Sequence, residues 1–250
     1  MDTSLAAIAL LPGLAIGSFL NVIAARVPLG RSIVAPASAC MSCGSSLAWY
    51  ENVPLLSFVA LRGRCRHCGE TIPWRYPAVE AATALLVAGC VLEFGMTWDA
   101  VVAAFFCASL VAVSATDLER RVIPNRVVVP AAAAVLAANT ILHPSVEWIA
   151  AGVGASLFLL VAALAYPGGM GMGDVKLALL LGVAVGRAVP VALFAGMIFA
   201  LLPSIVLLAK HGSSARKMGI PFGPFLALGG VVALFAGHAI LHAYLHGGLL

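Results

Sequence analysis

Charged side chains are scarce in this chain. Asp, Glu, Lys and Arg make up 10% of its 250 residues, whereas hydrophobic residues make up 62%. A soluble globular domain carries roughly a quarter of its residues as charged ones. The composition therefore leaves too little polar surface for a water-soluble globule and excludes soluble enzymes, disordered proteins and DNA-binding domains. The formal net charge of +4 does not indicate nucleic acid, because the basic residues follow membrane topology.

Long apolar stretches account for most of the sequence. A helix that spans a bilayer needs about 20 apolar residues, and the chain shows no internal repeat. The sequence predicts an all-α polytopic membrane protein with about eight transmembrane helices, of which the sixth and seventh are poorly separated. The predicted spans are residues 4–25, 78–96, 98–116, 127–142, 147–166, 175–187, 188–209 and 220–245.

Basic residues indicate the orientation of these spans, because they accumulate in cytoplasmic loops. All of them except Arg187 fall in alternate connections. The pattern predicts a multi-pass protein of the bacterial inner membrane with both termini outside. No basic residue precedes the first span, so we expect an uncleaved anchor rather than a signal peptide. The residues in the alternate connections are Arg26, Arg31, Arg62, Arg64, Arg66, Arg75, Arg120, Arg121, Arg126, Lys176, Lys210, Arg216 and Lys217.

The connection between the first two spans, residues 26–77, contains two C-x-x-C pairs. Two such pairs are typical of a tetrahedral four-thiolate zinc site. A segment of roughly 50 residues needs a staple of this kind to fold, and a reducing cytoplasm disfavours disulfides. We interpret it as a small cytoplasmic zinc-knuckle domain; a rubredoxin-like iron site and a dithiol redox pair are the alternatives. The predicted ligands are Cys40, Cys43, Cys65 and Cys68.

Two aspartates lie at the predicted cytoplasmic ends of spans. Asp117 ends the third span, and Asp174 opens the sixth after a glycine-rich run. Two adjacent carboxylates share a proton, so that one activates water while the other donates a hydrogen bond to a scissile carbonyl. We interpret the pair as the catalytic dyad of an aspartic protease; a loop ion pair is the alternative for Asp117. We expect the glycines of this run to prevent a regular helix and to let a substrate backbone approach closely. The candidate substrate-binding residues are Gly171, Gly173 and Lys176.

With these motifs the chain resembles the bacterial type IV prepilin peptidases, membrane aspartic proteases of the G-x-G-D type. The resemblance implies that Asp117 and Asp174 cleave the leader peptides of prepilins and pseudopilins at the cytoplasmic face. Asn125 stands where many members have Asp. Besides the cysteine pairs, the matching stretches are Gly17–Val22, Glu51–Phe58, Leu61–Cys65, Arg75–Glu80, Asp117–Asn125 and Gly171–Lys176.

The resemblance also implies a second activity. Many long-form members methylate the new N-terminus with S-adenosylmethionine. This step is associated with the connection that contains the cysteine pairs, residues 26–77, which we call the cysteine loop and which short-form members lack. For this step the resemblance implies Glu51, Arg64 and Glu80. A structural role in salt bridges within the loop would explain these three residues equally well. The implied domains are a first transmembrane helix (1–25), a cytoplasmic tetracysteine zinc-binding domain (26–77) and a seven-helix membrane peptidase domain (78–250).

Other functions remain open at this point. The enzyme could lack methylation, or the chain could be a non-catalytic membrane assembly factor whose zinc knuckle docks partners. A transporter with a proton relay is a third alternative, but it predicts carboxylates near the bilayer midplane and repeated halves. His238, His242 and His246 line one face of the last span and suggest either an interfacial polar stripe or a metal site.

Overall fold

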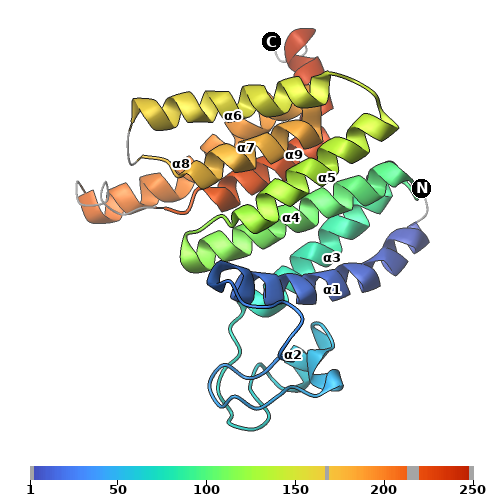
Figure 1. Ribbon diagram of the computed structural model, residues 1–250, viewed down its shortest axis with the longest axis vertical. Coiled ribbons are helices and arrows are strands. Elements are labelled where there is room, and N and C mark those ends of the chain that lie inside the picture. Colours follow the sequence, from blue (N-terminus) through green and yellow to red (C-terminus); the bar gives the residue numbers. More distant parts are fainter. Residues whose placement is uncertain (1–2, 167–168, 213–219, 248–250) are drawn as a thin grey trace. The chain divides into compact units, whose positions relative to one another are not determined.

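The computed structural model describes residues 3–166, 169–212 and 220–247, which are mostly helical outside the connection between α1 and α3 (Figure 1). Arg216 and Lys217, two of the predicted cytoplasmic basic residues, lie outside this part of the chain. Within it, β-structure is limited to two isolated bridges in the cysteine loop. The long helices are α1 (Thr3–Arg26), α3 (Arg75–Phe94), α4 (Trp98–Arg120), α5 (Asn125–Leu142), α6 (Glu147–Ala165), α7 (Met172–Val185), α8 (Val189–His211) and α9 (Gly223–Leu245).

Seven segments of the described chain are long and apolar enough to cross a membrane. One of them, Met172–Lys210, contains 39 residues and covers both α7 and α8. A straight helix of that length would measure roughly 60 Å, twice the hydrocarbon thickness of a bilayer. Gly186 interrupts it with a φ of +53° and begins a short 3₁₀ turn, η3 (Gly186–Ala188). The prediction of an all-α multi-pass membrane protein with about eight long helices is therefore confirmed.

The chain forms two compact units, Met1–Ala115 and Thr116–Leu250, and the boundary falls near the end of α4. In the first unit, α1 and α3 approach each other backbone to backbone. A Cβ atom at Gly13 would lie 2.7 Å from Ala84 Cα, and one at Gly17 would lie 2.7 Å from Glu80 Cα. The cysteine loop connects these two helices and contains the short helix α2 (Leu56–Ala60) and the 3₁₀ turns η1 (Val27–Leu29) and η2 (Trp49–Asn52).

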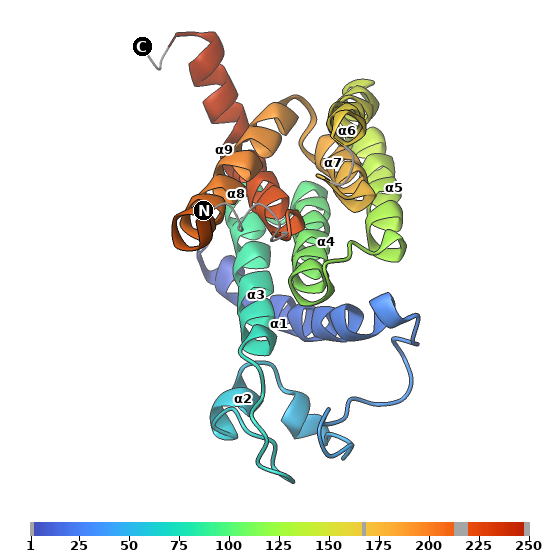
Figure 2. The same cartoon turned by 90° about the vertical axis from the view of Figure 1, so that its left-hand side faces the viewer.

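In the second unit, α7 packs against α5, α6 and α9, while α8 packs against α9. Figure 2 shows α6 beside α7 and α8 beside α9 as two helix pairs. Glycines allow both close approaches, because a Cβ atom at Gly182 would collide with the carbonyl of Ala151 and one at Gly229 with the carbonyl of Ala192. α7 is the most enclosed of these helices, and this burial fixes the position of its first turn.

The contact between α6 and α7 gives the first testable prediction. Gly182→Ala should lower the melting temperature of the purified protein, because overpacking at a rigid backbone contact costs roughly 1–3 kcal/mol. Gly154→Ala on α6 is the matched control, since a Cβ atom there meets nothing within 4 Å. Alanine is otherwise the better helix former, so the control should unfold at or above the wild-type temperature in a detergent thermal-shift assay. Equal melting temperatures for the two variants would contradict the close contact.

Arg187, the basic residue that departs from the topology pattern, forms an ion pair. Its Nε lies 2.9 Å from Glu147 Oε2, and its backbone N–H donates to Glu147 Oε1 at 2.8 Å. Glu147 begins α6, so the pair joins the start of that helix to the turn between α7 and α8. This turn belongs to the set of connections that otherwise contain no Lys or Arg. Its acidic partner Glu147 explains how Arg187 is accommodated there.

Candidate functional site

The two predicted aspartates are both buried in the second unit. Asp117 lies near the C-terminal end of α4 with 6% of its surface exposed, and Asp174 lies in the first turn of α7 with 8% exposed. The two carboxylates are close enough to interact electrostatically. Residues 57 positions apart in sequence are thus brought together by the packing of their helices. Carboxylates are rarely buried to this extent without a functional or pairing role.

Backbone N–H groups hold each carboxylate in place. Asp117 Oδ2 accepts a hydrogen bond from Gly223 N at 3.0 Å, and Asp174 Oδ2 accepts one from Gly171 N at 3.2 Å. Gly223 begins α9 and Gly171 is the N-cap of α7. The end of α4 and the beginnings of α7 and α9 therefore converge, and the N-terminal ends of two helices direct positive partial charge toward the carboxylates.

Small residues are required at this convergence. A Cβ atom at Gly223 would lie 2.8 Å from Asp117 Oδ2, and one at Gly173 would lie 2.8 Å from Ile123 Cβ. Ile123 also comes within 3.2 Å of the Gly223 position, so its side chain lies between the residues that flank the two aspartates. A larger residue at either glycine would displace a carboxylate or the isoleucine.

The glycine run differs from our expectation in one respect. Gly171 has the extended backbone of an N-cap residue, but α7 already begins at Met172, so that Gly173 and Asp174 belong to a regular helix. The prediction that the run prevents a regular helix is therefore wrong for Gly173. Close packing against Ile123, rather than an irregular backbone, explains its lack of a side chain.

Lys176, the third candidate substrate-binding residue, connects two elements of the second unit. Its Nζ donates a hydrogen bond to Asn125 Oδ1 at 2.9 Å, which joins α7 to the first residue of α5. Asn125 is the position at which many members of the family that the sequence resembles have Asp. An amide oxygen there supplies the acceptor that a carboxylate would supply, so the departure leaves this contact intact.

The four predicted metal ligands converge in the first unit. Their sulfur atoms all lie within 4.8 Å of one another, and Cys40 Sγ lies 3.8 Å from Cys68 Sγ. Four thiolates at 2.3 Å from a tetrahedral zinc ion would be about 3.8 Å apart. The donor set and its spacing therefore fit a four-thiolate metal site. Among the described residues, this is the one group of three or more ligand side chains placed to hold a metal ion.

The two C-x-x-C pairs fold in the same way. In each pair, the backbone N–H of the first cysteine donates to the carbonyl oxygen of the residue five positions later. The backbone N–H of the glycine after the second cysteine donates to the carbonyl oxygen of the first cysteine. Gly44 and Gly69 both have a φ of +72°, which the tight turn requires. Hydrogen bonds from the side chain and backbone of Ser45 lower the pKa of Cys43 to about 6. The thiolate that a metal binds is thereby favoured at neutral pH.

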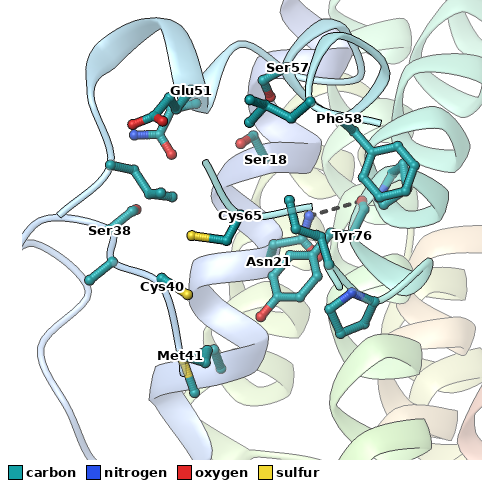
Figure 3. A pocket seen from close by; sticks show the side chains of 18 of the residues that line it. Ser18, Asn21, Ser38, Cys40, Met41, Glu51, Ser57, Phe58, Cys65 and Tyr76 are labelled. Atoms are coloured by element: carbon teal, nitrogen blue, oxygen red, sulfur yellow. Dashed lines mark hydrogen bonds between the residues drawn. The ribbon is translucent and has the colours of Figure 1, made fainter. Parts of the chain in front are cut away.

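A cavity of about 600 Å³ lies between the cysteine loop and helices α1 and α3 (Figure 3). Ser18 and Asn21 of α1 and Tyr76 of α3 line one side, and Cys40 and Cys65 of the metal site line the other. Two of the three predicted methylation residues, Glu51 and Glu80, also line it. Arg64 is exposed and lies outside the lining.

The histidine face of α9 does not gather into a metal site. The rings of His242 and His246 stack at a centroid distance of 4.1 Å, and His246 Nδ1 lies 3.0 Å from the carbonyl oxygen of His242. Among the described residues, these histidines belong to no group of three or more ligand side chains placed to hold a metal ion. The geometry therefore favours the polar-stripe interpretation of this face.

Gly223 is the site residue that sequence reasoning missed. It lies 106 positions from Asp117 along the chain, and its contribution is a backbone N–H, which no side-chain motif reveals. The available signal was Gly223 followed by Pro224 directly before an apolar stretch, a pattern typical of a helix start. That signal predicts the beginning of α9 but not its partner.

The chain is similar to known proteins over most of its length. Residues 11–94 match the bacterial peptidase A24 N-terminal domain, and residues 104–205 match the type IV leader peptidase family. Proteins named prepilin leader peptidase/N-methyltransferase are 36% identical in Bacillus subtilis, covering 93% of this chain and 95% of that protein, and 35% identical in Pseudomonas aeruginosa, covering 94% and 92%. No solved structure matches the chain. The chain thus belongs to the type IV leader peptidase family, as its motifs had suggested.

Proposed function

We propose that the chain removes the leader peptides of type IV prepilins and pseudopilins and then methylates the new N-terminus. The main observation in support of peptidase activity is the buried pair of Asp117 and Asp174, which accept hydrogen bonds from the first residues of two helices. Family membership supports both activities, since the relatives are named for both. The buried pair also counts against a non-catalytic assembly factor, which would not need carboxylates fixed in this way.

In the proposed mechanism the two carboxylates share one proton. The ionised member accepts a proton from water, which attacks the scissile carbonyl carbon, while the protonated member donates a hydrogen bond to the carbonyl oxygen. The tetrahedral intermediate collapses when the leaving amine nitrogen takes a proton and its bond to carbon breaks. The N–H groups of Gly171 and Gly223 hold one oxygen of each carboxylate and so preorganise the dyad.

We place the substrate-binding region at Gly171, Gly173 and Lys176, around the first turn of α7. A pilin N-terminal segment is apolar and can lie against the membrane-spanning helices, with its cleavage site at their ends. The distribution of basic residues supports an inner-membrane protein with both termini outside and the dyad at the cytoplasmic face. The substrate's leader and the methyl donor would then both be cytoplasmic.

We assign a structural zinc ion to Cys40, Cys43, Cys65 and Cys68, and we assign methylation to the loop region that contains Glu51, Arg64 and Glu80. The sulfur spacing supports zinc, which would cross-link the two knuckles. S-adenosylmethionine is the proposed methyl donor, and it supplies an electrophilic methyl group. The chain's contribution is to hold the donor and the new N-terminal amine within reach of each other.

The test separates the two activities. We expect the purified wild type to convert a prepilin and S-adenosylmethionine into a product that has lost the leader and gained one methyl group, as measured by mass spectrometry. When mature pilin cleaved beforehand is supplied, Asp117→Asn should still methylate it at near wild-type rate, because methylation needs only a free N-terminus. Loss of the leader without a methyl group would indicate a peptidase alone, and an unchanged substrate would indicate an assembly factor.

A further inference from the structure

Helix α2 of the cysteine loop presents its apolar side chains to the outside. Leu56 and Val59 lie three positions apart, and therefore on one face of the helix, and they are 69% and 72% exposed. Ser57 and Phe58 instead line the cavity (Figure 3). A helix of a module surrounded by water places its polar face outward and its apolar face inward. The reverse arrangement of α2 indicates an apolar environment outside the helix.

Two contacts fix α2 beside the beginning of α3. The backbone N–H of Leu55, directly before α2, donates to Glu80 Oε2 at 2.9 Å, and Glu80 lies in the second turn of α3. The ring centres of Phe58 and Trp74 lie 5.0 Å apart, and Trp74 directly precedes α3. Both views show α2 beside this end of α3 (Figure 1 and Figure 2). The short helix is therefore level with the first two turns of α3.

The length of α3 determines where this level lies in the membrane. The helix is one of the segments that are long and apolar enough to cross a bilayer, and it contains 20 residues. A helix of this length measures roughly 30 Å, about the thickness of the hydrocarbon core. Since α3 has no length to spare, its first two turns lie at the boundary between hydrocarbon and headgroups. Trp74, which is 76% exposed, has the position of an interfacial aromatic anchor.

The charge of the cysteine loop is complementary to an anionic membrane surface. Residues 26–77 contain six arginines and two glutamates, and one of these glutamates, Glu51, is buried. Arg62 lies two residues beyond the end of α2 and is exposed. Basic side chains beside exposed apolar ones are typical of segments that bind anionic headgroups and bury their apolar face at the edge of the acyl chains.

We propose that α2 and Trp74 form an interfacial anchor that binds anionic phospholipid. Leu56, Val59 and Trp74 insert at the edge of the acyl chains, and Arg62 binds the phosphate of a lipid headgroup. The cysteine loop is then attached to the bilayer at a third point, besides the ends of α1 and α3, and is not a domain suspended in the cytoplasm. The anchor depends on neither of the two proposed activities.

The fluorescence of a single tryptophan tests the position of α2. The full-length chain carries Phe at all four native tryptophan positions, and Val59→Trp then places one indole on the exposed face of α2. The protein is placed in nanodiscs of phosphatidylcholine mixed with phosphatidylglycerol. Phospholipids brominated near the headgroup end of their acyl chains should quench most of the emission, whereas acrylamide dissolved in the water should quench little of it.

His67→Trp in the same background is the matched control, because His67 is an exposed residue of the same loop that lies between two metal ligands. Its emission should respond to acrylamide and not to the brominated lipid. Quenching of the Val59→Trp chain by acrylamide alone would show that α2 faces water. Quenching by neither agent would show that protein, such as a second copy of the chain, covers the helix. Either result would overturn the proposal.

The role of Arg62 is measured with the same probe. Quenching of the Val59→Trp chain by brominated lipid should be stronger in nanodiscs that contain phosphatidylglycerol than in phosphatidylcholine alone, because the guanidinium attracts an anionic headgroup. Adding Arg62→Gln should remove this difference. A difference that persists in the Arg62→Gln chain would show that Arg62 does not bind the headgroup.

A variant with Leu56→Ser and Val59→Ser together tests the anchor without adding an apolar probe. In the mixed nanodiscs, trypsin should cleave it after Arg62 roughly tenfold faster than the wild type or more, because the loss of apolar burial lets the segment open more often. Val34→Ser is the matched control, since Val34 is an exposed apolar residue of the same loop outside α2. It should be cleaved at the wild-type rate. Equal rates for the double variant and the wild type would contradict the anchor.

Discussion

Asp117→Asn and Asp174→Asn should each reduce leader removal by roughly a thousandfold or more, the scale expected when an acid–base group is removed from a reacting centre. Each amide keeps the size of the side chain and an oxygen that can accept the N–H of Gly223 or Gly171. What it loses is the ability to carry the proton that the dyad exchanges with water and substrate. Single-turnover cleavage of a prepilin in detergent, followed by mass spectrometry, measures the effect.

Glu119→Gln provides the control for this result. It lies on α4 two positions from Asp117, and its carboxylate forms an ion pair with Arg120 at 3.7 Å. Its removal should leave cleavage close to the wild-type rate. The two Asn variants should also unfold at or above the wild-type temperature, because neutralising buried catalytic carboxylates removes a desolvation cost. If either Asn variant turned over at a near wild-type rate, the assignment of that aspartate to the catalytic dyad would be wrong.

Cys40→Ser and Cys65→Ser should each reduce the bound metal from about one ion per chain toward zero. Each substitution removes one of four convergent sulfur ligands, and a hydroxyl is a poor substitute for a thiolate. Elemental analysis of the purified protein measures zinc and iron together, so it also distinguishes the zinc site from the rubredoxin-like alternative. Full metal content in both variants would contradict the site.

Cys107→Ser is the control for metal content. Cys90 and Cys107 are buried in α3 and α4 with their sulfurs 3.9 Å apart, and they are not part of the tetracysteine group. The Cys107→Ser variant should therefore retain its metal. In the tetracysteine variants, limited proteolysis should cut the cysteine loop while α1 and α3 stay paired, because those helices contact each other through their own backbones. Loss of membrane-inserted protein, instead of loop cleavage, would show that the metal supports the whole first unit.

Patterns that are local in sequence predicted most of this structure. Apolar stretches indicate helices directly, and the cysteine spacing indicates convergence because each pair is a short turn. The two aspartates were found because acidic residues are scarce beside apolar spans. Separating α7 from α8 was harder, since η3 is short and both helices are apolar. The interruption depends on the backbone of Gly186, whose Cβ position would meet Glu147 Oε1 and Trp148.

Features that depend on tertiary packing could not be predicted. The bond from Gly223 to Asp117 requires α9 to begin beside the end of α4, and no sequence pattern encodes that pairing. The cavity lined by Glu51 and Glu80 is similar, because it forms only when the cysteine loop folds against α1 and α3. Sequence reasoning could therefore name the residues but could not distinguish Arg64, which lies outside the cavity, from the two carboxylates within it.

The contact between Asn21 and Tyr76 has a consequence for how the cysteine loop is built into the chain. It joins α1 to α3 close to where the chain leaves one helix and returns to the other. A segment whose two ends are already clamped can change in length at small entropic cost, about 0.6 kcal/mol for each doubling. Insertions or deletions within the loop should accordingly leave the register of the helix pair unchanged.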